Sequence, residues 1–90
     1  MKILLVSPSV DTCYEYVSPL GLMNLCIIGK DLGYSMELLD LSRESYEKGV
    51  EKILSKQYDL VGISCNFTNS APSCIQYAKE IRKKYPQTII

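Results

Sequence analysis

The sequence contains no histidine, and this absence removes several kinds of chemistry. Histidine serves more often than other side chains as a general base and as a metal ligand near neutral pH. A catalytic triad with a histidine base and a metal site with imidazole ligands are therefore excluded for this chain. A cysteine nucleophile would also lack its usual activating base, although a thiol pKa can be lowered in other ways.

An excess of charge of one sign and long apolar runs are missing as well. Ten basic and ten acidic residues cancel, so the chain offers no basic face of the kind that binds nucleic acid. No stretch is long enough to span a membrane, and the apolar run after Met1 is too short for the core of a signal peptide. We expect a cytoplasmic protein that contacts neither nucleic acid nor a membrane.

The four cysteines follow none of the common metal-binding or redox spacings. They are Cys13, Cys26, Cys65 and Cys74. Hydrophobic residues make up 47% of the chain, which supplies a core without a disulfide scaffold. We expect Cys26 and Cys74 to be packing residues on helix faces, whereas Cys13 and Cys65 fall in a loop and at a strand end.

Short apolar runs alternate with helical patterns along the chain. The runs cover residues 2–7, 35–41, 59–64 and 88–90. Each is typical of a parallel strand buried on both faces. The connections are too long for hairpins and favour parallel pairing. We predict an α/β fold, a flavodoxin-like (Rossmann-like) three-layer sandwich whose parallel sheet has the order 2-1-3-4.

Serine and proline open the first and third helical patterns, where they suit an N-terminal turn. The first pattern begins at Ser18 and Pro19, is apolar on most sides, and has Gly33 placed for a left-handed cap at its end. The third begins near Ser70, which can cap it. Its expected buried stripe consists of Cys74, Ala78, Ile81 and Tyr85.

The last predicted strand, residues 88–90, has barely begun when the sequence ends. A parallel strand at an open sheet edge is prone to pair with another chain. We therefore expect residues 1–90 to be the N-terminal portion of a single domain, with no second domain in this chain. We also expect a homodimer through the open sheet edge.

In an open parallel sheet, ligands bind beyond the carboxyl ends of the strands, at the point where the strand order reverses. For the order 2-1-3-4 this point lies between the first and third strands, where residues 7–18 and 65–70 converge. Small and polar side chains follow both strands. They could line a ligand site, or they could only terminate a strand, cap a helix or face solvent. The candidate binding residues here are Ser7, Pro8, Ser9, Ser64, Cys65, Asn66, Phe67 and Thr68.

Several ligands of such folds can be excluded. The first strand is followed neither by the glycine fingerprint of dinucleotide-binding folds nor by a Walker A loop. The segment SPSVDTCYEYV does not have the Thr, Gly and Ser content of a flavodoxin phosphate loop. The third strand ends in Ser64, Cys65 and Asn66 without a carboxylate, so a phosphate-receiver domain is excluded too.

Four segments, MKILLVSPS, SPLGLMNL, GYSMELLDL and YDLVGISCNFTNS, together resemble the N-terminal domain of cobalamin-dependent radical SAM proteins. The most telling piece is Pro19, Leu20 and Gly21, which join the candidate cofactor-binding residues. The resemblance implies cobalamin in this domain and a downstream radical SAM domain as its partner. The cluster motif Cys-x-x-x-Cys-x-x-Cys is absent here, so S-adenosylmethionine and a 4Fe–4S cluster would belong to that downstream domain.

The end of the third strand also resembles the cobalamin domain of methionine synthase, which has a serine, then a threonine four residues on, then a serine two further. Ser64, Thr68 and Ser70 match this pattern. The resemblance implies that Ser64 lines the slot for the dimethylbenzimidazole tail and that Thr68 lies near the corrin. The Asp-x-His-x-x-Gly loop of methionine synthase is absent, which favours the radical SAM subgroup.

Two other functions stay open from the sequence. A degenerate flavodoxin-like domain without a cofactor would serve as an interaction or packing module, and fold alone does not decide against it. A small enzyme with Cys65 as its nucleophile would have no histidine to activate the thiol. No acid, base or nucleophile has an evident partner, so we expect no catalysis from this chain by itself, only a part in methyl transfer or radical rearrangement by a complete enzyme.

Overall fold

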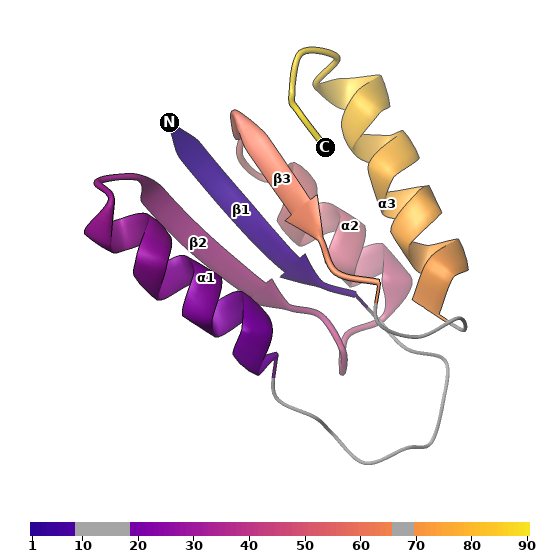
Figure 1. Cartoon of the computed structure of the whole chain (residues 1–90). Helices are drawn as coiled ribbons and strands as arrows, with labels where there is room; N and C mark the ends of the chain where they lie inside the picture. Colours follow the sequence, from indigo (N-terminus) through magenta and orange to yellow (C-terminus); the bar gives the residue numbers. More distant parts are fainter. Residues whose placement is uncertain (9–18, 66–69) are drawn as a thin grey trace.

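Three parallel strands form the sheet of the computed structural model, which describes residues 1–8, 19–65 and 70–90. The strands are β1 (Lys2–Ser7), β2 (Ser35–Asp40) and β3 (Leu60–Ile63), in the order β2-β1-β3. The helices are α1 (Leu20–Asp31), α2 (Tyr46–Leu54) and α3 (Ala71–Lys84). Helix α1 covers one face of the sheet and helices α2 and α3 cover the other (Figure 1). The predicted three-layer α/β sandwich is confirmed.

The main core lies between the sheet and the α2–α3 layer. Leu4 and Val6 of the central strand point into it and are fully buried, as is Val61 of β3, which pairs with Leu4. Ile53 of α2 and Ile81 of α3 close the core from the helix side. Continuous apolar character in β1 follows from this arrangement, because a central parallel strand has helices on both faces.

Residues 88–90 occupy the place of the fourth strand, next to β3. The amide of Val61 donates to the carbonyl oxygen of Ile89 at 2.8 Å. The amide of Ile89 donates to the carbonyl oxygen of Asp59 at 3.0 Å. The resulting parallel bridge between Leu60 and Ile89 is isolated, so this segment is not a full strand. Its position agrees with the predicted order 2-1-3-4.

Helix ends follow local sequence signals in two of the three helices. Gly33 has a positive φ of 91° after α1. The amide of Gly33 donates to the carbonyl oxygen of Lys30, and the amide of Tyr34 donates to the carbonyl oxygen of Gly29, each at 3.0 Å. This pair of hydrogen bonds is a Schellman motif. Ser45 caps α2, since its hydroxyl accepts from the amide of Lys48 at 3.3 Å. The predicted cap of α3 is wrong in detail, because Ser70 holds the N-cap position without a side-chain cap hydrogen bond.

The contact between α2 and α3 centres on Tyr77, which sequence reasoning missed. Tyr77 is 1% exposed and its ring stacks on that of Tyr46, with centroids 5.2 Å apart. Gly49 makes room for it, since a Cβ at this position would lie 2.6 Å from the Tyr77 hydroxyl oxygen. Of the predicted stripe on α3, only Ile81 is fully buried, and Cys74, Ala78 and Tyr85 are half-buried.

Helix α1 leaves most of its large apolar side chains in solvent. The exposed ones in this region are Leu20 (64%), Met23, Leu25, Ile27, Ile28 and Leu32. Leu20, a candidate cofactor-binding residue, is thus exposed, whereas Cys26 is buried as predicted. Within the part of the chain that the structure describes, no helix combines the length and the apolar character required to cross a membrane.

Candidate functional site

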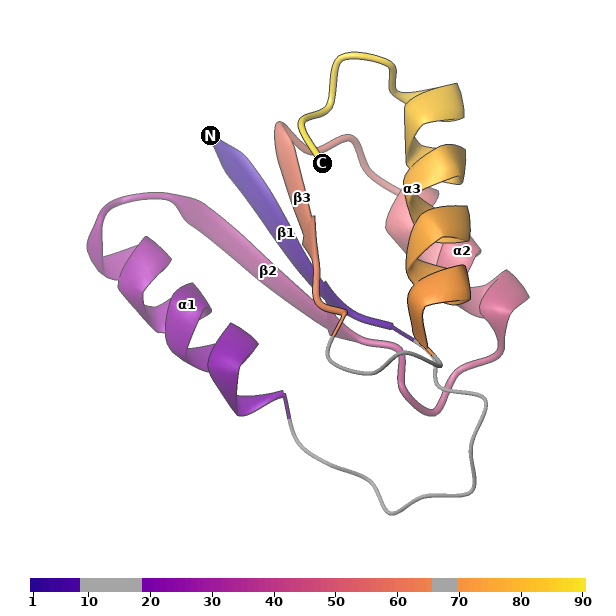
Figure 2. The same ribbon diagram turned by 45° about the vertical axis from the view of Figure 1, so that its right-hand side comes forward.

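The carboxyl ends of β1 and β3 meet at one edge of the sheet, and all three helices begin at that edge (Figures 1 and 2). The amide of Ser64, directly after β3, donates to the carbonyl oxygen of Val6 at 3.0 Å. On the other side of β1, the amide of Leu41 donates to the backbone carbonyl oxygen of Ser7 at 2.8 Å. The structure therefore brings Ser7 and Ser64 to the point between the strands where an open parallel sheet binds ligands.

Ser64 combines partial burial with an unused hydroxyl. Its side chain is half-buried, and within residues 1–8, 19–65 and 70–90 its hydroxyl has no hydrogen-bond partner. The backbone around it is held firmly, because its carbonyl oxygen also accepts from the Cys74 thiol at 3.3 Å. A fixed, small hydroxyl of this kind leaves room for a flat ring and offers it one hydrogen bond.

The two cysteines at this edge lie close together, which the sequence did not reveal. Cys65 is exposed and its sulfur lies 4.0 Å from the hydroxyl oxygen of Ser70. Burial raises the pKa of the Cys74 thiol to about 11, with further contributions from a hydrogen bond and a charge interaction with Cys65. The prediction that Cys74 is only a packing residue on α3 misses this contact with the strand end.

The remaining candidate residues fall into two groups. Pro8 is buried directly after β1. Pro19, Leu20 and Gly21 stand at the start of α1, on the opposite face of the sheet from α3 (Figure 2). A Cβ added to Gly21 would meet nothing within 4 Å, so this glycine borders open space. The other candidates, Ser9, Asn66, Phe67 and Thr68, lie outside the described residues, and their roles stay predictions.

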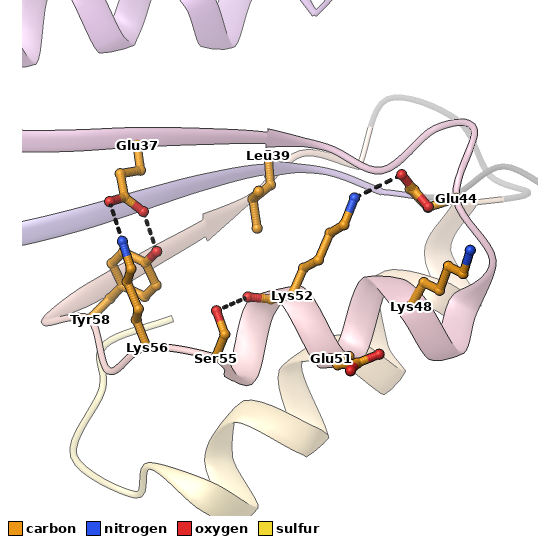
Figure 3. A pocket seen from close by; sticks show the side chains of 9 residues that line it. All are labelled: Glu37, Leu39, Glu44, Lys48, Glu51, Lys52, Ser55, Lys56 and Tyr58. Atoms are coloured by element: carbon orange, nitrogen blue, oxygen red, sulfur yellow. Dashed lines mark hydrogen bonds and ion pairs between the residues drawn. The ribbon is translucent and has the colours of Figure 1, made fainter.

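A groove of about 630 Å³ lies away from this edge, where α2 packs over β2 (Figure 3). Four of its ionic groups form two pairs: Lys52 pairs with Glu44 at 2.8 Å and Lys56 with Glu37 at 3.2 Å. The Tyr58 hydroxyl also donates to the Glu37 carboxylate. These side chains come from separate segments without a common motif, so sequence reasoning could not group them. Because four of its charged side chains already pair with one another, we do not regard this groove as the ligand site.

Tyr58 and Glu37 change each other's ionisation. Burial raises the pKa of Tyr58 to about 12, and its hydrogen bond to Glu37 adds to this effect. The pKa of Glu37 is lowered, first by the hydrogen bond from Tyr58 and then by that from Lys56. Both shifts favour the state with a neutral phenol and an ionised carboxylate, so the pair stabilises the contact between β2 and the segment that leads into β3.

Among the residues that the structure describes, no group of three or more acidic or cysteine side chains could hold a metal ion. The sequence model of the family described as "B12 binding domain" matches residues 6–90 of the chain. Searches of curated proteins and of solved structures gave no match. The matched region includes every candidate residue of the sheet edge.

Proposed function

Because this chain belongs to the B12-binding domain family, we propose that it is the cobalamin-binding module of a B12-dependent radical SAM enzyme. The family accounts for cobalamin binding. The radical SAM context is supported by the order and spacing of the four segments and by the lack of histidine. The function of the complete enzyme, methyl transfer or radical rearrangement of a substrate, is part of the proposal.

Ser64 is the observation that carries the proposal. It stands at the carboxyl end of β3, hydrogen-bonded through its amide to Val6 of the central strand. The residue is half-buried and its hydroxyl has no partner among the described residues, which fits a residue that lines the slot for the dimethylbenzimidazole tail. Ser7 and Pro8 at the end of β1 form the neighbouring wall.

The residues of this chain bind and orient the cofactor, and they contribute no proton transfer of their own. Cobalamin, when bound, supplies the chemistry of methyl transfer or radical formation. With no histidine in the sequence, none of these 90 residues can ligate cobalt through an imidazole. We propose that S-adenosylmethionine and a 4Fe–4S cluster belong to a downstream radical SAM domain of the same protein, in the cytoplasm.

A second candidate function is an interaction module without a cofactor. The exposed apolar residues of α1 favour it, since Leu25, Ile27 and Ile28 are each more than half exposed. Contiguous apolar surface on a soluble domain marks a place where another surface packs. The two functions differ in whether the sheet edge at Ser64 takes up cobalamin.

A visible-absorption titration with hydroxocobalamin distinguishes them. The chain of residues 1–90 and the full natural protein that contains it are both titrated and then passed through a desalting column. We expect the cobalamin bands to shift and pigment to leave the column with the protein in at least one of the two. If neither retains pigment while circular dichroism shows both to be folded, the cobalamin assignment is wrong.

A further inference from the structure

Cys65 and Cys74 form a pair of thiols at the carboxyl edge of the sheet. Cys65 follows β3 after one residue, and Cys74 lies in the first turns of α3. The Cys74 thiol donates to the carbonyl oxygen of Ser64 at 3.3 Å, and the Cys65 sulfur is 4.0 Å from the hydroxyl oxygen of Ser70. Ser64 directly precedes Cys65, and Ser70 is the N-cap residue of α3. These contacts hold two cysteines from different elements close together.

We propose that Cys65 and Cys74 form a reversible disulfide that links the end of β3 to the start of α3. Both are reduced thiols in this structure. Disulfide formation requires sulfurs that can approach each other without a large movement of the backbone. The Cys74 thiol contacts the residue next to Cys65, and the Cys65 sulfur contacts the N-cap residue of the helix that contains Cys74, so the two sulfurs can approach each other with little backbone movement.

The two thiols differ in a way that assigns the order of steps. Cys65 is exposed, whereas Cys74 is half-buried. Attack on a soluble disulfide depends on access and on the thiolate fraction. Cys65 therefore reacts first and Cys74 resolves the mixed disulfide.

A small-molecule disulfide such as oxidised glutathione is a sufficient oxidant. The Cys65 thiolate attacks one sulfur of glutathione disulfide, that S–S bond breaks, and one glutathione leaves and takes up a proton. Cys74 then loses its proton and attacks the Cys65 sulfur, which releases the second glutathione. The protein loses two electrons and two protons, and two molecules of reduced glutathione carry them away.

The raised pKa of Cys74 is compatible with the second step. Its largest cause is burial, and the next two are a hydrogen bond and a charge interaction with the Cys65 thiol. Once Cys65 is bonded to glutathione, it has no thiol proton and cannot ionise. Its hydrogen bond and its charge interaction with Cys74 are therefore lost, while the contribution of burial stays. The pKa of Cys74 should then fall below about 11, and a larger fraction of the resolving thiol becomes thiolate.

A consequence for cobalamin rests on the proposed function. Cys65 is next to Ser64 and is itself a candidate wall residue. A disulfide ties it to α3 and changes the wall beside the tail slot. We infer that the oxidised and reduced forms bind cobalamin with different affinity, so that the pair couples cofactor binding to the thiol redox state of the surroundings.

Chymotryptic mapping tests the disulfide without any cobalamin. Reduced protein is incubated with oxidised glutathione, alkylated with N-ethylmaleimide, unfolded and digested. Trypsin leaves both cysteines on one peptide, residues 57–79, but chymotrypsin cleaves after Phe67 and separates them. Wild type should yield two peptides joined through Cys65 and Cys74, about 2 Da lighter than the sum of the reduced peptides. The matched variant Cys26→Ala should behave identically.

Two further results complete the test. Cys74→Ser should stop at a mixed disulfide of Cys65 with glutathione, because the resolving thiol is gone. If wild type also stops there, or if both cysteines are alkylated, or if Cys65 is joined to Cys13, the proposed pair is wrong. Oxidised and reduced wild type, freed of glutathione, are then titrated with hydroxocobalamin. Equal affinity would overturn the coupling alone, and no binding by either form would count against the proposed function but leave the disulfide standing.

Discussion

The backbone amide of Ser64 and the carbonyl oxygen of Val6 are joined by a hydrogen bond of 3.0 Å. This bond continues the pairing of β3 with β1 by one residue beyond the last strand residue, Ile63. It fixes the first polar residue after β3 beside the central strand. The ligand-binding position of an open parallel sheet is thereby lined by a residue whose backbone is anchored to the central strand.

The close approach of α2 to α3 predicts opposite effects for two helical glycines. Gly49→Ala would place a Cβ 2.6 Å from the Tyr77 hydroxyl oxygen, and overpacking of this kind costs about 1–3 kcal/mol of unfolding free energy. Gly21→Ala adds a Cβ in open space and should stabilise the helix by about 0.5–1 kcal/mol. Urea denaturation of the two variants measures both effects. A neutral Gly49→Ala would mean that Tyr77 has room to move away.

Local signals explain how much of this fold could be predicted. The limits of β1 come directly from its apolar run, and the end of α1 follows from Gly33, which alone adopts a positive φ in the described chain. Such features depend on a few neighbouring residues. The expected sheet order is confirmed because right-handed parallel connections leave few alternatives.

Features that depend on distant packing could not be predicted in the same way. Helix α1 is apolar on nearly every side, so its sequence does not indicate that Cys26 is buried while Leu25, Ile27 and Ile28 are exposed. Tyr77 is buried because Gly49 from another helix makes room for its ring. The proximity of Cys65 and Cys74 likewise depends on where α3 begins relative to β3. For the site, position at the sheet edge was predictable, but this pairing was not.

The Tyr58–Glu37 hydrogen bond predicts a stability profile with two limits in pH. The folded-state pKa of Tyr58 is raised from 10.0 to about 12, so its contribution is complete below pH 10 and is lost as the pH rises toward about 12. The pKa of Glu37 is lowered from 4.5, so its contribution is complete above that pH and is lost as the pH falls through the lowered value.

Tyr58→Phe removes the shared hydrogen bond and should weaken both effects. We expect a loss of about 1 kcal/mol at neutral pH and a smaller fall in stability between pH 10 and about 12. Thermal unfolding followed across the pH range measures this. Tyr34→Phe, at a tyrosine that is 44% exposed, is the matched control and should leave the profile unchanged. Identical alkaline profiles for Tyr58→Phe and wild type would show that Tyr58 does not control this limit.

The outer edge of β3 predicts self-association. Val61 and Ile89 already share a hydrogen bond, but Ile63, further along the same edge, has no neighbouring strand among the described residues. We expect the edge to pair with that of a second copy. Sedimentation analysis should show a mass that rises toward a dimer with concentration, and the amide of Ile63 should exchange more slowly in the dimer. A constant monomer mass would rule out this pairing.

The most direct test of cobalamin binding at the sheet edge compares two serine-to-tyrosine variants. Ser64→Tyr would fill the space beside the ends of β1 and β3. Ser35→Tyr places the same ring at the exposed first residue of β2, at the opposite edge of the sheet. Both are titrated with hydroxocobalamin in the protein form that retains pigment, with circular dichroism as the check on folding.

We predict that Ser35→Tyr binds as wild type does and that Ser64→Tyr loses at least about tenfold in affinity, which corresponds to about 1.4 kcal/mol. This result would place cobalamin at the residue that the hydrogen bond to Val6 holds in position. Equal binding by folded Ser64→Tyr and wild type would contradict the account, because the cofactor would then lie away from the carboxyl ends of β1 and β3.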